Sequence, residues 1–214
     1  MKLYIYENCP FCVRARMIFG LKKLNVEKIA LQQDDNDTPI KLVGKKSVPI
    51  FDNDEGVIMP ESLDIVRYVD SHYGTPILRD SIRPEIQQWA DSVAYTYKMY
   101  FPRFAKLKLA EHQTPSALRY YIESKTKWLG NFDELYAKTT QFLNQLDEDL
   151  AKLESLMLGD ESIADVLSME DILIFPTLRN LTVVKGVKFP PKIQHYVETM
   201  AKKADVDLFW ERAV

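Results

Sequence analysis

The sequence predicts an α/β domain over residues 1–74, a linker over residues 75–84 and an all-helical domain over residues 85–214. In the first 74 residues, short strand and helix patterns alternate in the order β-α-β-α-β-β-α. After the Gly-Thr-Pro sequence at 74–76 and a charged segment that ends in proline at position 84, no convincing strand pattern appears again. Apolar residues then recur at helical spacing to the C-terminal region, so the two parts belong to different structural classes.

The α/β part begins with a strand pattern over residues 1–6, which are apolar, β-branched or aromatic apart from one lysine. A helix follows through Leu24, because its apolar positions recur three or four residues apart. Thr38 is expected to cap a helix of barely two turns that Gly44 ends. The other predicted elements are a strand over 26–32, a strand over 47–51, a hairpin turn at 53–56, a strand over 57–59 and a helix that opens at Glu61-Ser62.

The helical part is predicted to begin with a helix whose apolar stripe runs from Ile86 to Phe101 and which Pro102 stops. The C-terminal tail after residue 204 gives no clear pattern. The remaining helices are expected over 115–128, from near Asn131 to Met157, from a capping-box pattern at Ser168–Asp171 into a segment that Pro176 kinks or bounds, and from Pro190-Pro191 to near Lys203.

Composition limits the classes of partner. The chain has 214 residues, of which 46% are hydrophobic and 28% charged, and its formal net charge is −3. These are ordinary values for a globular protein, and the charge gives no reason to expect nucleic acid or an anionic membrane as a partner. No apolar run is long enough to cross a bilayer, and the N-terminus does not resemble a secretory signal. With only two cysteines, the expected location is the cytoplasm.

The two cysteines form the motif Cys9-Pro10-Phe11-Cys12 at the junction of the first strand and helix. Pro10 suits the first helical turn, where its missing N–H costs nothing. The positive end of the helix favours a thiolate at Cys9, and Cys12 lies one turn inside, close enough to resolve a mixed disulfide. Arg14 and Arg16 either add positive potential to the site or belong to a solvated helix face.

Four interpretations of this cysteine pair compete. Zinc needs about four ligands, but there are no more cysteines, and His72, His112 and His195 are scattered. Iron–sulfur ligation within one chain fails for the same reason, unless subunits and glutathione share a cluster. A structural disulfide would close too small a loop to stabilise much. Two inert core thiols remain an alternative, which the proline between them disfavours, and a dithiol redox centre is the favoured interpretation.

Three segments together carry a resemblance to a known family. Cys9-Pro10-Phe11-Cys12, Ser47-Val48-Pro49-Ile50 and Glu61-Ser62 are similar to the glutathione-binding, thioredoxin-fold domain of glutaredoxins. With the added helical domain, the whole chain resembles the bacterial two-domain glutaredoxin 2 type, which shares the architecture of glutathione S-transferases. Further stretches that carry the likeness are 15–22, 42–44, 59–62 and 178–182.

The resemblance implies roles for individual residues of the three segments. Cys9 would be the nucleophile and Cys12 the resolving thiol, with no metal. Val48, ahead of a cis Pro49, would pair its backbone with glutathione. Ser62 and the start of its helix would hold the γ-glutamyl carboxylate, which fits the affinity of helix N-termini for anions. The residues implied to bind glutathione are Cys9, Phe11, Val48, Pro49, Glu61 and Ser62.

Two positions depart from the family pattern. Many glutaredoxins have Tyr where Phe11 stands, and Lys or Arg where Tyr6 stands. Without that cation, the helix terminus must supply more of the thiolate's stabilisation. The source of that stabilisation is therefore an open question that the sequence poses.

The expected function is glutathione-dependent thiol–disulfide exchange on glutathionylated proteins and protein disulfides. Alternatives of the same architecture are a glutathione transferase or dehydroascorbate reductase, which need no second thiol, and a non-catalytic interaction module. The resemblance implies a monomer. Four aromatic residues could line a cleft between the domains or belong to the core, namely Tyr95, Tyr97, Tyr100 and Phe101.

Overall fold

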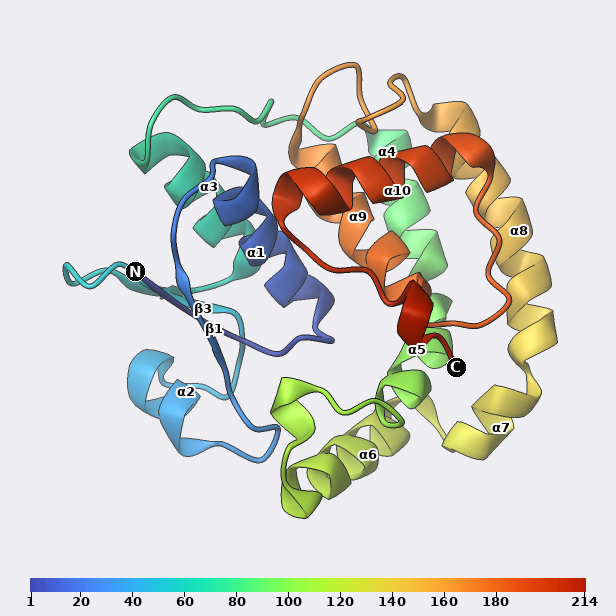
Figure 1. Cartoon of the computed structure of the whole chain (residues 1–214), viewed down its shortest axis with the longest axis horizontal. Coiled ribbons are helices and arrows are strands. Elements are labelled where there is room, and N and C mark those ends of the chain that lie inside the picture. The colour runs from blue at the N-terminus through green and yellow to red at the C-terminus, as the bar shows by residue number, and fades with distance from the viewer.

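The computed structural model describes residues 1–214, and Figure 1 shows an α/β part beside a helical part. The predicted order β-α-β-α-β-β-α of the first part is confirmed. Its elements are β1 (Lys2–Ile5), α1 (Pro10–Leu21), β2 (Glu27–Ala30), α2 (Asp37–Val43), β3 (Ile50–Asp52), β4 (Ile58–Pro60) and α3 (Ser62–His72).

The four strands form one mixed sheet in the order β2-β1-β3-β4. β1 is parallel to β2 and antiparallel to β3, and β3 is antiparallel to β4. In Figure 1, α1 and α3 pack together on one face of the sheet and α2 lies on the other. This is a thioredoxin-like arrangement, and it places the end of β1 and the start of α1 beside the helical part.

The second part contains no named strand, as predicted. Its α-helices are α4 (Pro84–Ser92), α5 (Tyr97–Phe104), α6 (Pro115–Leu129), α7 (Phe132–Ala137), α8 (Thr139–Leu156), α9 (Met169–Leu181) and α10 (Pro191–Ala204). Three 3₁₀ segments accompany them, η1 (Val93–Thr96), η2 (Ala110–His112) and η3 (Trp210–Arg212). The capping box at Ser168 and Asp171 is confirmed, and Pro176 lies inside α9.

The prediction of one helix from Ile86 to Phe101 is wrong. It is interrupted by η1, where the buried Thr96 hydroxyl donates to the Val93 carbonyl at 2.7 Å and so competes with the helical ladder. Pro102 does not stop α5, which continues to Phe104. The proline removes one N–H that would bond the carbonyl of Lys98, an exposed residue, so water can satisfy that group.

Two other helix boundaries also differ from prediction. Asn131 does begin a helix, since its side chain accepts from the N–H groups of residues 133 and 134, but that helix ends at Ala137 after only six residues. The Thr139 hydroxyl donates to the Tyr136 carbonyl at 2.7 Å and accepts from Arg103, which separates α7 from α8. Thr38 is not an N-cap, because α2 already begins at Asp37, whereas Gly44 ends it with φ of 74° as predicted.

The two parts share one hydrophobic core. A single cluster of 43 buried residues includes members of β1, α1 and α3 as well as α5, α8, α9 and α10. Helices α1 and α10 approach so closely that a Cβ on Gly20 would lie 1.9 Å from the Ala204 carbonyl oxygen. Because the core is continuous, the boundaries 1–74, 75–84 and 85–214 stay a prediction. No helix combines the length and apolar character needed to cross a membrane.

Candidate active site

The structure places Cys9 immediately before α1, as its N-cap residue, with the extended backbone typical of that position. Its Sγ accepts the backbone N–H of Cys12 at 3.4 Å, and Pro10 is the first helical residue. Cys12 is fully buried, and its Sγ accepts the N–H of Tyr6 at 3.4 Å. Both cysteines are free thiols, and Cys9 is the more accessible of the two.

The surroundings of the two thiols move their pKa values apart. The pKa of Cys9 is lowered by the hydrogen bond from the Cys12 thiol, against an opposing effect of burial, with help from the backbone N–H groups of Cys12 and Phe11 and from the charge of Lys125. The pKa of Cys12 is raised well above its usual value by burial and by the hydrogen bond to Cys9. One thiol is thus prepared to ionise while the other keeps its proton.

The loop before Cys9 is fastened by the helical part. Fully buried Arg179 of α9 donates to the Glu7 carbonyl at 2.8 Å, and the Asn180 side chain donates to the Asn8 carbonyl at 2.9 Å. From η2, the buried carboxylate of Glu111 accepts the N–H of Asn8 at 2.9 Å. Three side chains from two distant segments therefore define the path of the backbone into Cys9.

A cleft of about 350 Å³ lies over Cys9, between the two parts of the chain. The α/β part contributes Cys9, Phe11 and Val48 to its lining. Of the aromatic residues expected here, Tyr97 and Phe101 line the cleft, whereas Tyr100 is fully buried and Tyr95 turns its hydroxyl to Asp149 at 3.0 Å. The other residues of the helical part at the cleft are Tyr120, Ser124, Lys125 and Trp128.

A smaller hollow of about 160 Å³ adjoins the cleft, since Phe11, Ser47 and Val48 line both. Its other walls are Pro49, Glu61 and Ser62, so the cleft and the hollow together contain every residue that the resemblance implies for glutathione. The Val48–Pro49 peptide bond is cis. The Ser47 hydroxyl is buried and has no hydrogen-bond partner, which leaves it free to bond a ligand.

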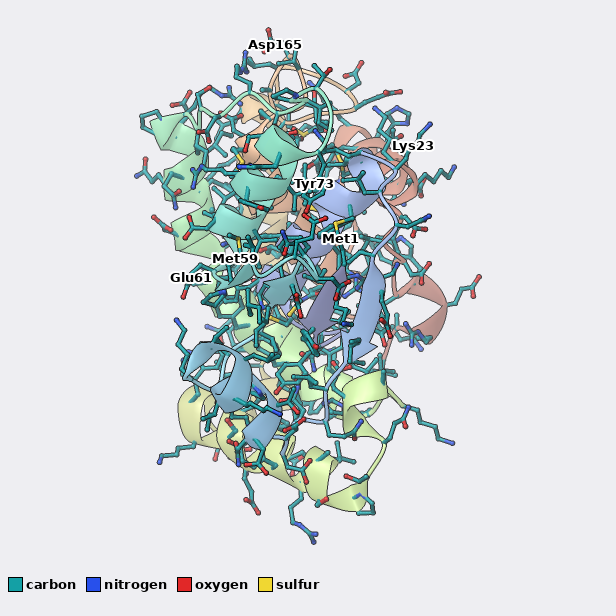
Figure 2. The ribbon with its side chains drawn as sticks, turned by 90° about the vertical axis from the view of Figure 1, so that its left-hand side faces the viewer. Met1, Lys23, Met59, Glu61, Tyr73 and Asp165 are labelled. Atoms are coloured by element: carbon teal, nitrogen blue, oxygen red, sulfur yellow. The ribbon has the colours of Figure 1, made fainter.

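Ser62 is the first residue of α3, so the unpaired N–H groups of that helix begin at the hollow. The preceding Glu61 has φ of 72°, a left-handed conformation that is costly for a residue with a side chain. Figure 2 shows Glu61 at the surface close to Met59 of β4. The Glu61 carboxylate accepts the Lys45 ammonium at 2.6 Å, in an exposed ion pair.

Several cleft residues were not predicted as site residues. Ser47 was placed in the predicted strand over 47–51 and in one of the three resemblance segments, but was given no role of its own; the strand in fact begins at Ile50. The cleft residues Lys125 and Trp128 lie on one face of α6 with the buried Tyr121, since the three are spaced four and three residues apart. That spacing was available in the sequence, but nothing in it indicates that this face meets Cys9. No group of three or more His, Cys, Asp or Glu side chains is placed to hold a metal ion.

Comparison with known proteins identifies the family. The model of the glutaredoxin 2 C-terminal domain matches residues 85–213. The chain belongs to the glutaredoxin 2 family. A glutathione S-transferase N-terminal domain model matches residues 3–77, and glutaredoxin 2 of Escherichia coli is 42% identical over the full length of both chains.

Solved structures agree with this family. Glutaredoxin 2 of Salmonella typhimurium, crystallised in complex with glutathione, is 42% identical and superimposes with a TM-score of 0.96, covering 100% of this chain and 98% of that one. A glutathione transferase of Phanerochaete chrysosporium superimposes with a TM-score of 0.74 at 17% identity, over 97% of this chain and 98% of that one. The predicted transferase-like architecture of a glutaredoxin 2 is thereby confirmed.

Proposed function

We propose that this glutathione-dependent oxidoreductase acts through Cys9 as nucleophile and Cys12 as resolving thiol. The observation that carries the proposal is the continuity of the two cavities: the accessible thiol at the start of α1 opens into a cleft that adjoins the hollow lined by Val48, Pro49 and Ser62. Glutathione in that hollow would lie beside Cys9. The complex of the Salmonella relative with glutathione supports this choice of cosubstrate.

With a glutathionylated protein, the Cys9 thiolate attacks the glutathione sulfur. A Cys9–glutathione disulfide forms, and the protein sulfur leaves as a thiolate that takes up a proton. The thiolate of a second glutathione then attacks the glutathione sulfur of that disulfide. Oxidised glutathione leaves, and the Cys9 thiolate is restored. In the net exchange one free glutathione thiol is consumed, one protein thiol is released, and the disulfide passes from the protein to oxidised glutathione; Cys12 takes no part.

With a protein disulfide, Cys9 forms a mixed disulfide with one sulfur and releases the other as a thiol. Cys12 then loses its proton and attacks Cys9, which frees the reduced protein and leaves a Cys9–Cys12 disulfide. Two glutathione molecules reduce this bond and leave as one molecule of oxidised glutathione. The buried, protonated state of Cys12 supports this order, because only Cys9 is ready to attack first.

The glutathione contacts are proposed residue by residue. Val48 would pair its backbone with the glutathione cysteine next to Pro49, Ser62 would bind the γ-glutamyl carboxylate and Glu61 its ammonium, with Phe11 as an apolar wall. The same proposal includes glutathionylated and disulfide-containing proteins as substrates. It also includes a monomeric state and a cytoplasmic location.

The test uses Cys9→Ser and Cys12→Ser, assayed on a glutathione mixed disulfide and on a protein disulfide with glutathione as reductant. We expect Cys9→Ser to abolish both activities, and Cys12→Ser to keep much of the first while losing most of the second. Full activity of Cys9→Ser on the mixed disulfide would contradict the proposal. Unchanged reduction of the protein disulfide by Cys12→Ser would remove the resolving role.

A further inference from the structure

Lys125 of α6 brings a positive charge from the helical part into the cleft that holds Cys9. Its ammonium lies over the Phe101 ring at 4.5 Å from the centroid and over the Trp128 ring at 5.1 Å. Tyr121 is the third ring beneath it, at 5.9 Å. Aromatic faces attract a cation through their quadrupole, so these rings hold the ammonium in the cleft.

The lysine has no acidic partner. None of the ion pairs of the protein includes Lys125, and its ammonium donates no side-chain hydrogen bond. Aromatic rings position a cation without cancelling its charge, whereas a carboxylate would neutralise it. The side chain is half-buried, so water screens that charge less than at an open surface.

We propose that Lys125 is the cation that stabilises the Cys9 thiolate, so that the helical domain completes the electrostatics of the redox site. The proposal rests on the function proposed for Cys9 as nucleophile. Tyr6 occupies the position where many glutaredoxins have a cation next to the thiol, so the thiolate of Cys9 needs another source of positive charge. Lys125 would be that source. Here the charge comes from the helical part of the chain, on α6.

The electrostatics of the two groups are consistent with this assignment. The charge of Lys125 lowers the pKa of Cys9. Burial lowers the pKa of Lys125, and the charge of Cys9 opposes that effect. Such mutual effects arise when opposite charges share a poorly solvated space. Lys125 would act by stabilising the thiolate of Cys9 and would not touch the substrate, so it is a positioning residue.

Other charged and titratable groups face the same thiol. Lys46 also lines the cleft, but its ammonium donates to the Gln33 carbonyl at 2.7 Å and lies over the Tyr120 ring at 3.7 Å. Arg14 of α1 lies over the Phe11 ring at 4.9 Å and is a second cation near Cys9. The thiol of Cys12 and the phenol groups of Tyr6, Tyr97 and Tyr120 also lie around Cys9, and the buried phenols of Tyr100 and Tyr121 lie behind them.

The test is a titration of the Cys9 thiolate in the full-length reduced protein, followed by its ultraviolet absorbance and by the pH dependence of its alkylation by iodoacetamide. We expect Lys125→Met to raise the pKa of Cys9 by about one pH unit. Lys125→Arg keeps the charge and should stay close to wild type. Lys127→Met is the matched control, because Lys127 lies exposed on the same helix and forms no ion pair.

An unchanged Cys9 pKa in Lys125→Met, or an equal shift in Lys127→Met, would overturn the proposal. Circular dichroism and the melting temperature check that α6 stays folded, and Lys125→Gln replaces the methionine variant if it does not. The titration uses neither glutathione nor substrate. A wild-type protein inactive on glutathione mixed disulfides would therefore refute the proposed function, while the titration still decides the role of Lys125.

Discussion

The side-chain amide of Asn180 in α9 donates to the backbone carbonyl of Asn8 at 2.9 Å, and Asn8 immediately precedes Cys9. Asn180 is fully buried, and Asn8 nearly so. Removing the amide would leave a buried carbonyl without its partner, which costs more than the loss of an exposed hydrogen bond. The position of the nucleophile thus depends on a helix that is distant in sequence.

Asn180→Ala is expected to lower the free energy of unfolding by about 1–3 kcal/mol. It should also reduce the rate of mixed-disulfide reduction, because the loop before Cys9 loses a fixed point. Urea unfolding and a steady-state assay measure the two effects. Asn25→Ala, at an exposed position without a side-chain hydrogen bond, is the control and should change stability by less than about 0.5 kcal/mol. Wild-type stability in Asn180→Ala would contradict the prediction.

Gly20→Ala is expected to destabilise the protein by about 1–3 kcal/mol, because the added Cβ would meet the Ala204 backbone 1.9 Å away and force α1 and α10 apart. Helix propensity alone predicts the opposite sign, a gain of about 0.5–1 kcal/mol for alanine within a helix. Urea unfolding distinguishes the two, and a variant more stable than wild type would show that the helices separate at little cost.

His112→Phe is expected to make stability less dependent on pH. Both ring nitrogens of His112 are buried without partners, and burial lowers the pKa of His112 to about 4, below the usual histidine value of about 6.5. Between these values the unfolded chain binds the proton and the folded protein does not. The contribution of His112 to stability is therefore lost as the pH falls from about 6.5 to about 4.

Urea unfolding at several pH values across this window, for wild type and His112→Phe, measures the difference. The phenylalanine keeps an aromatic ring against Tyr121, whose centroid lies 4.4 Å from that of the imidazole. Burial raises the pKa of Asp171 to about 6, which acts in the opposite direction over part of the window, but it is common to both proteins and cancels. Parallel pH profiles would rule out His112 as the source.

Local patterns predicted most of the fold. The proline and cysteines at the start of α1, the glycine that ends α2 and the capping box of α9 each act over a few residues, and the structure confirms them. The errors in the helical part arose where threonine hydroxyls donate to the helix backbone at Val93 and Tyr136. Whether such a hydroxyl points into its own helix depends on packing that the sequence pattern does not contain.

The site could be predicted only in its α/β half. Cys9, Val48 and Ser62 fall in short motifs that can be recognised in the sequence, and the structure gathers them around adjoining cavities. Lys125 and Trp128 have ordinary spacing for a solvated helix face. Their proximity to Cys9 depends on how α6 packs against η2 and α5, which is a property of the whole tertiary fold.

The anchoring of the loop before Cys9 also affects when the active site can form during synthesis of the chain. A nascent chain that has emerged as far as the linker carries both thiols but none of Glu111, Arg179 and Asn180, which bind the backbone of Glu7 and Asn8. We expect the loop to stay unanchored until synthesis has passed α9. The enzyme would then gain its working nucleophile late in translation, although the ribosome makes that cysteine among the first ten residues.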